Sequence, residues 1–105
     1  MSDSKPTLAI LGGSGDLGGG LAFRWARAGY PIIIGSRSAD KAEQAATELA
    51  AKGLAGKVRG LDNEAAARAG DIVVLTVPFA NQAPTLEAIK AAVQGKILVD
   101  VTVPL

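Results

Sequence analysis

Cysteine and histidine are both absent from this chain of 105 residues. Their absence excludes disulfides, thiolate catalysis, Ser-His catalytic pairs and the usual zinc sites. The formal net charge is only +1 and no basic run occurs, so we expect neither nucleic acid nor an acidic membrane as a partner. No apolar run approaches the ~20 residues of a membrane span, and the N-terminus lacks a signal-peptide core. These absences predict a cytoplasmic location.

Aromatic residues are also rare, at 4%, whereas hydrophobic residues make up 49% of the chain. Short aliphatic runs alternate with amphipathic segments, a pattern typical of βα units on a parallel sheet. The predicted strands span residues 7–11, 32–35, 57–59, 71–78 and 96–101. The predicted helices span residues 16–28, 39–52, 63–69 and 84–93. Short connections between these elements predict an α/β domain with a Rossmann-type, doubly wound parallel sheet in strand order 3-2-1-4-5.

Glycine, proline and serine residues mark the predicted helix ends. Gly29 is expected just past the first helix, which Pro31 prevents from continuing. Ser38 is expected to cap the second helix, and Gly70 and Gly95 to end the two later ones. On the first helix, the residues expected to face the core are Leu17, Leu21, Ala22, Trp25 and Ala28. On the second helix, they are Ala42, Ala45, Ala46, Leu49 and Ala50.

The first predicted strand runs directly into the glycine-rich stretch GGSGDLG, which opens the first helix. It contains a Gly-x-Gly-x-x-Gly pattern at Gly13, Gly15 and Gly18. Glycines here allow a tight turn and a close approach of the backbone to a pyrophosphate, and the helix N-terminus favours an anion. The alternative is a turn without a ligand. Ser14 either donates to a phosphate or serves the turn, and Asp16 is expected to act as a helix cap.

The residues after the second strand indicate which nucleotide binds. A domain that binds NAD places Asp or Glu there to accept hydrogen bonds from the ribose 2′-hydroxyl. This chain instead has Ser36 and Arg37, with Lys41 one turn into the next helix. Two cations and a hydroxyl suit a 2′-phosphate, which a carboxylate would repel. We therefore favour NADP over NAD; the alternative is that Arg37 and Lys41 are ordinary solvated charges.

The last two strands supply further candidates at the same edge of the sheet. Pro78 is expected to fix the exit of the fourth strand and to line the cleft, where Phe79 either faces the cofactor or closes the core. Asp100 is expected either to be a buried partner of a donor or to orient a loop. A dinucleotide domain normally continues to a sixth strand, so we expect the front part of a longer enzyme, without its C-terminal substrate domain. The fifth strand should then be an unpaired edge.

Four blocks carry a family resemblance: ILGGSGDLGGGLA (10–22), IIIGSRSADKAEQAA (32–46), DIVVLTVPF (71–79) and GKILVDVTVPL (95–105). Together they resemble the NADPH-dependent coenzyme F420 reductases, also called F420-dependent NADP oxidoreductases. The resemblance implies hydride transfer between NADP and the deazaflavin coenzyme F420, small-molecule cofactors as partners, a homodimer and no metal. Pyrroline-carboxylate reductases and ferric reductases share some of these features, and a non-catalytic NADP-binding module remains an alternative.

The resemblance also implies which residues contact the cofactor, and it assigns no catalytic acid or base to this part of the enzyme. The implied phosphate-loop contacts are Ser14, Gly15, Asp16 and Leu17. The implied contacts to the 2′-phosphate are Ser36, Arg37 and Lys41. The residues implied along the nicotinamide half of the cleft are Phe79, Ala83 and Val103.

Overall fold

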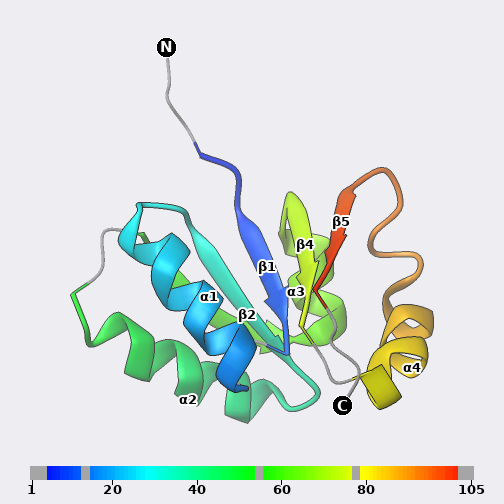
Figure 1. Cartoon of the computed structure of the whole chain (residues 1–105), viewed down its shortest axis with the longest axis horizontal. Helices are drawn as coiled ribbons and strands as arrows, with labels where there is room; N and C mark the ends of the chain where they lie inside the picture. Colours follow the sequence, from blue (N-terminus) through cyan, green and yellow to red (C-terminus); the bar gives the residue numbers. More distant parts are fainter. Residues whose placement is uncertain (1–4, 13–14, 54–55, 77–78, 102–105) are drawn as a thin grey trace.

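The computed structural model describes residues 5–12, 15–53, 56–76 and 79–101 (Figure 1). It contains one five-stranded sheet in the order β3-β2-β1-β4-β5, and all four strand pairs are parallel. The strands are β1 (Leu8–Leu11), β2 (Ile32–Ser36), β3 (Val58–Asp62), β4 (Ile72–Leu75) and β5 (Ile97–Asp100). The helices are α1 (Asp16–Arg27), α2 (Ala39–Ala50), α3 (Asn63–Ala69) and α4 (Phe79–Ile89). The predicted fold class and strand order are confirmed.

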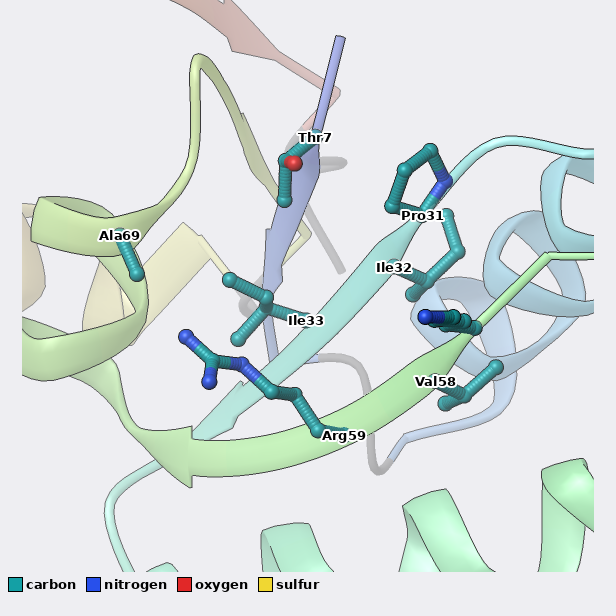
Figure 2. Close-up of a pocket in the computed structure, with 8 residues that line it drawn as sticks. Thr7, Pro31, Ile32, Ile33, Val58, Arg59 and Ala69 are labelled. Carbon is teal, nitrogen blue, oxygen red and sulfur yellow. The ribbon is translucent and has the colours of Figure 1, made fainter. Parts of the chain in front are cut away.

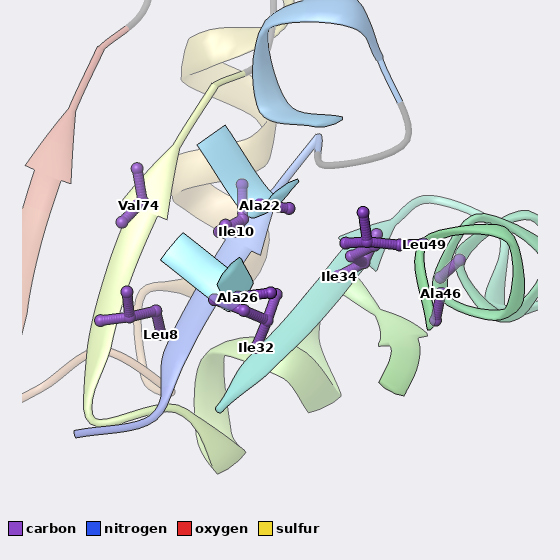
Figure 3. Close-up of a cluster of buried hydrophobic side chains, with 10 residues drawn as sticks. Leu8, Ile10, Ala22, Ala26, Ile32, Ile34, Ala46, Leu49 and Val74 are labelled. Carbon is purple, nitrogen blue, oxygen red and sulfur yellow. The ribbon is translucent and has the colours of Figure 1, made fainter. Parts of the chain in front are cut away.

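Two hydrophobic layers enclose the sheet. Helices α1 and α2 cover one face and α3 and α4 the other (Figure 1). Alternate residues of β1 enter opposite layers, Ile10 that of α1 and α2 and Leu11 that of α3 and α4, and all four residues of the strand are buried. Figure 3 shows Ala22 and Ala26 of α1 above the strands in the first layer. None of the helices in the described ranges is long and apolar enough to cross a bilayer.

Helix α1 meets the sheet through small residues. Gly18, Ala22 and Ala26, spaced by four, are buried. The prediction that Leu17 and Ala28 face inward is wrong: Leu17 is 44% exposed and Ala28 is exposed as well. The other three predicted inward positions are buried or half-buried. Small side chains let the helix lie close to the sheet, which leaves its larger residues at the margins of the contact.

Helix α1 ends where the sequence predicts. Gly29 has φ of 101°, a left-handed conformation that glycine adopts without strain. Its N–H donates to the carbonyl of Ala26 at 3.0 Å, and the N–H of Tyr30 donates to that of Trp25 at 3.1 Å. This pair of bonds is the Schellman motif, which satisfies carbonyl groups that the helix end leaves open.

Helix α2 starts at its predicted cap, because the Oγ of Ser38 accepts a hydrogen bond from the N–H of Lys41 at 3.3 Å. Its inward face was predicted almost correctly, with three of the five positions buried and Ala45 half-buried. Ala50, the fifth, is exposed. It lies about 100° around the helix from Leu49, outside the buried stripe.

Three elements have a boundary that differs from the prediction by more than two residues. Strand β3 continues to Asp62, because Gly60 pairs with β2 instead of ending the strand. Strand β4 is described to Leu75, and Val77 and Pro78 lie outside the described residues. Helix α4 begins five residues before Pro84, which therefore lies inside the helix. It ends at Ile89, so the predicted end at residue 93, next to Gly95, is wrong. A proline inside a helix removes one backbone hydrogen bond and crowds the preceding turn, yet α4 continues through Pro84 to Ile89.

The two edges of the sheet have opposite character. All four residues of β5 are exposed, among them Ile97 at 62%, Leu98 at 38% and Val99 at 40%. At the opposite edge, β3 is flanked by charged groups such as Arg59, a common protection against edge-to-edge pairing. Asp100 is exposed, so a buried position for this residue is wrong.

We expect the chain to associate with itself through β5 as its concentration rises, because apolar edge strands pair with other strands. Leu98→Lys should reduce this association, since it places a charge in the middle of the exposed edge. Static light scattering over a concentration series measures the effect, with Gln44→Lys on the exposed face of α2 as the control of equal charge. A monodisperse unmodified monomer at every concentration would contradict the prediction.

Candidate functional site

The candidate site lies at the carboxyl edge of the sheet, where the parallel strands all end. The chain winds outward in one direction from β1 and in the other from β4, so these two strands form the point at which the winding reverses. Open parallel sheets bind their ligands in the crevice at this point. The predicted site residues within the described ranges follow β1, β2 and β4 and therefore gather at this edge.

A glycine turn connects β1 to α1. Gly12 has φ of 83°, and its N–H donates to the carbonyl of Gly35 at 2.8 Å, which ties the turn to the end of β2. The N–H of Gly15 donates to the carbonyl of Gly12 at 3.0 Å. The N-cap position is Gly15 and not Asp16, so the cap predicted for Asp16 is wrong: this residue is the first of the helix.

Because a glycine occupies the N-cap, this position offers no side chain to cap the first turn of α1. The opening N–H groups of a helix have no partner within it, so here they remain available to an anion. Leu17 belongs to this turn, and its side chain is exposed. The part of Leu17 that could contact a ligand here is therefore its backbone N–H. Gly13 and Ser14, also predicted here, lie outside the described residues.

The end of β2 is polar and basic. Ser36 is only 8% exposed, and its Oγ accepts a hydrogen bond from the N–H of Ser38 at 3.3 Å. Arg37 and Lys41 are exposed, and in the described part of the chain no carboxylate lies within ion-pair distance of either cation. A phosphate group would fit this arrangement, since two cations and a hydroxyl complement its charge and its acceptor oxygens.

Two neighbours of this basic group were missed by the sequence reasoning. Asp62 pairs in register with Ser36, and its Oδ1 accepts from the N–H of Ala65 at 2.9 Å, which caps α3. An Asp before a helix is an ordinary N-cap signal that could have been noticed. The carboxylate is thus engaged in holding a helix end. Asn63, the first residue of α3, has no comparable signal in the sequence.

Gly35 and Asn63 pack closely together at this edge. A Cβ at Gly35 would lie 2.7 Å from Cδ2 of Leu11 and 2.9 Å from Oδ1 of Asn63, so these two side chains fill the space beside the glycine. Oδ1 of Asn63 is buried without a hydrogen-bond partner in the described part of the chain. A buried acceptor beside the glycine turn is suited to a ligand that brings a donor.

The other half of the crevice follows β4. Thr76 donates through its N–H and its Oγ1 to the carbonyl of Leu11, at 2.9 and 2.7 Å, which joins the ends of β4 and β1. Phe79 begins α4, and Ala83 is exposed in the same helix. The structure therefore places the start of α4 after this strand end. Pro78 and Val103, the other residues predicted for this half, lie outside the described residues.

A hollow of about 430 Å³ lies elsewhere, at the amino ends of β1, β2 and β3 (Figure 2). Thr7, Pro31, Ile33 and Arg59 are among its lining residues, and Figure 2 shows Arg59 extending from β3 on the side where Ala69 lies. None of the predicted site residues lines it. It is therefore separate from the candidate site. Within the described ranges, no three acidic side chains come together as metal ligands would.

A doubly wound parallel sheet with a glycine turn at a helix start and a basic group after β2 defines a dinucleotide-binding domain. The family model described as "NADP oxidoreductase coenzyme F420-dependent" matches residues 7–104. The chain belongs to this family.

Curated relatives of this chain carry the name F420-dependent NADP reductase. The protein of Methanothermobacter marburgensis is 48% identical over 101 residues, covering 93% of this chain and 45% of the relative. That of Methanocaldococcus jannaschii is 44% identical over 102 residues, with coverage of 93% and 45%. The chain thus spans about half the length of the curated relatives it matches.

Solved structures resemble the fold at much lower identity. A lactate dehydrogenase from a Medee basin deep-sea metagenome library has a TM-score of 0.76 at 16% identity, covering 94% of this chain and 38% of that chain. A short-chain dehydrogenase from Sphingobium yanoikuyae, solved in complex with NADPH, has a TM-score of 0.60 at 21% identity, with coverage of 91% and 53%. These likenesses concern the fold.

Proposed function

We propose that residues 1–105 form the NADP(H)-binding domain of an enzyme that transfers a hydride between NADPH and coenzyme F420. The observation that carries the proposal is the basic group at the end of β2, where Ser36, Arg37 and Lys41 stand beside the glycine turn. Membership of the family, and the name of the relatives that span twice this length, support the deazaflavin as the second substrate. The proposal includes a cytoplasmic location and a homodimer, both based on the similarity to this family.

In this proposal each part of the carboxyl edge holds one part of NADP. The free N–H groups at the start of α1, with Gly13, Ser14, Gly15, Asp16 and Leu17, hold the pyrophosphate. Arg37 and Lys41 neutralise the 2′-phosphate and Ser36 donates its hydroxyl to it, since its Oγ is already an acceptor for Ser38.

The nicotinamide half lies along the end of β4. Pro78, Phe79, Ala83 and Val103 line it, and the bonds from Thr76 to Leu11 keep the two sides of the crevice at a constant separation. When bound, the nicotinamide supplies or accepts the hydride itself. The residues of this chain orient the ring and exclude water, and they provide no general acid or base.

Titration with NADPH and NADH tests the nucleotide. Binding of NADPH is expected to be tighter, followed through the fluorescence of the reduced nicotinamide or of Trp25. Equal curves for the two nucleotides would contradict the choice of NADP.

A second candidate function for residues 1–105 is NADP binding without catalysis. An absorbance assay with NADPH and oxidised coenzyme F420 distinguishes the two functions. Turnover by the 105-residue chain would exclude the binding-only function, whereas tight NADPH binding without turnover would favour it.

A further inference from the structure

Asn63 has a side chain that the fold does not explain. Its Oδ1 is buried and has no hydrogen-bond partner among the described residues. Native structures contain few such atoms, because an acceptor removed from water without a new partner costs free energy. Its surroundings are apolar, with Leu11 and Ala66 both adjoining the space beside Gly35. An apolar side chain would suit this position better if folding were its only task.

Helix capping does not account for Asn63 either. Asparagine at a helix start usually accepts a hydrogen bond from a backbone N–H of the first turn. In α3 that bond is made by Asp62, whose Oδ1 accepts from the N–H of Ala65 at 2.9 Å. Asp62 therefore already caps α3, and Asn63 is the first residue of the helix after this cap.

The position of Asn63 is close to the candidate nucleotide site. Oδ1 of Asn63 would lie 2.9 Å from a Cβ at Gly35, and the carbonyl of Gly35 accepts from the N–H of Gly12 in the glycine turn. Asp62, the preceding residue, pairs in register with Ser36. Asn63 therefore lies at the carboxyl edge, beside the ends of β1 and β2. In the proposed function the adenosine ribose lies at this edge, between the pyrophosphate and the 2′-phosphate.

We propose that Asn63 positions the adenosine ribose of NADP, its Oδ1 accepting a hydrogen bond from the 3′-hydroxyl. Oδ1 of Asn63 lacks a hydrogen-bond donor. When the 2′-oxygen of the ribose carries a phosphate, the 3′-hydroxyl is the donor that the ribose still offers. The terminal torsion of asparagine is broad, so the amide turns toward the ribose at little cost. The inference rests on the proposed function and adds to the NADP site a residue that contacts the adenosine ribose.

Asn63→Leu tests this inference with two measurements. Thermal unfolding of the nucleotide-free variant is expected at the same or a higher temperature, because the substitution removes an unpaired buried acceptor. NADPH affinity is expected to fall roughly three- to tenfold, the loss of one hydrogen bond. Glu64→Gln, at the exposed neighbouring position, should leave the NADPH affinity unchanged. Asn63→Ala, which adds no bulk, should show the same loss of affinity.

A 3′-deoxy analogue of NADPH gives the direct readout. The unmodified chain should bind the analogue roughly three- to tenfold more weakly than NADPH, whereas Asn63→Leu should bind both equally. A lower unfolding temperature with unchanged NADPH affinity and unchanged discrimination would overturn the inference and leave NADP binding intact. Failure of the unmodified chain to bind NADPH at all would instead overturn the proposed function, and this inference with it.

Discussion

Arg37→Ala is expected to weaken NADPH binding by about 1–3 kcal/mol, roughly 5- to 150-fold in affinity. The guanidinium makes charge-assisted hydrogen bonds with a phosphate, and these are stronger than bonds between neutral groups. NADH lacks the 2′-phosphate, so its affinity should change little. Fluorescence titration of both nucleotides measures the difference. Because Arg37 is exposed, the loss should shrink as ionic strength rises.

Arg24→Ala is the matched control for Arg37→Ala. Arg24 is also exposed, but it belongs to the last turn of α1, at the opposite end of that helix from the glycine turn. Removing it changes the net charge equally and should leave both affinities as they were. If Arg37→Ala weakened NADPH and NADH by the same factor, Arg37 would have no specific role at the 2′-phosphate.

Gly60→Ala is expected to lower the free energy of unfolding by on the order of 3 kcal/mol. Gly60 lies in β3 directly beneath α2, and a Cβ there would collide with the carbonyl group of Ala42 and lie 2.6 Å from the N of Glu43. These are backbone atoms of a helix, so relief requires moving all of α2 away from the sheet. Thermal denaturation followed by circular dichroism should show Tm lowered by more than about 10 °C.

Gly20→Ala is the control, with the opposite expected sign. Gly20 is exposed in the middle of α1, and nothing lies within 4 Å of a Cβ built there. Alanine in a helix interior is about 0.5–1 kcal/mol more favourable than glycine, so Tm should rise by a few degrees. A Gly60→Ala chain as stable as the unmodified one would mean that α2 does not pack on β3 as closely as described.

Local signals account for the parts of the fold that were predicted well. Helix α3 has the predicted bounds, and Gly70 ends it as predicted. The Ile-rich run of β2 and the Val-rich run of β4 follow the pattern of strands buried on both faces. The start of α4 was placed five residues late because Pro84 is a common first residue of a helix, and here it lies inside one.

The candidate site was predictable to the extent that its residues follow strands. In a parallel sheet the residues after each strand meet at one edge. The sequence alone therefore predicted that the glycine turn and Arg37 lie close together. Asn63 could not be found in this way. Its interest depends on a missing hydrogen bond and on the absence of a side chain at Gly35, and both are properties of the packed structure.

The sequence by itself determined the order of the elements, and it predicted the edge at which a ligand would bind and the charge that favours a 2′-phosphate. Hydrophobic period, turn residues and charge are local properties, and they act over a few residues of chain. Tertiary structure alone decided that α1 approaches the sheet through Gly18, Ala22 and Ala26 while Leu17 is exposed. It also decided that Gly60 lies under α2. These outcomes depend on close packing between segments far apart in the chain, which no local pattern encodes.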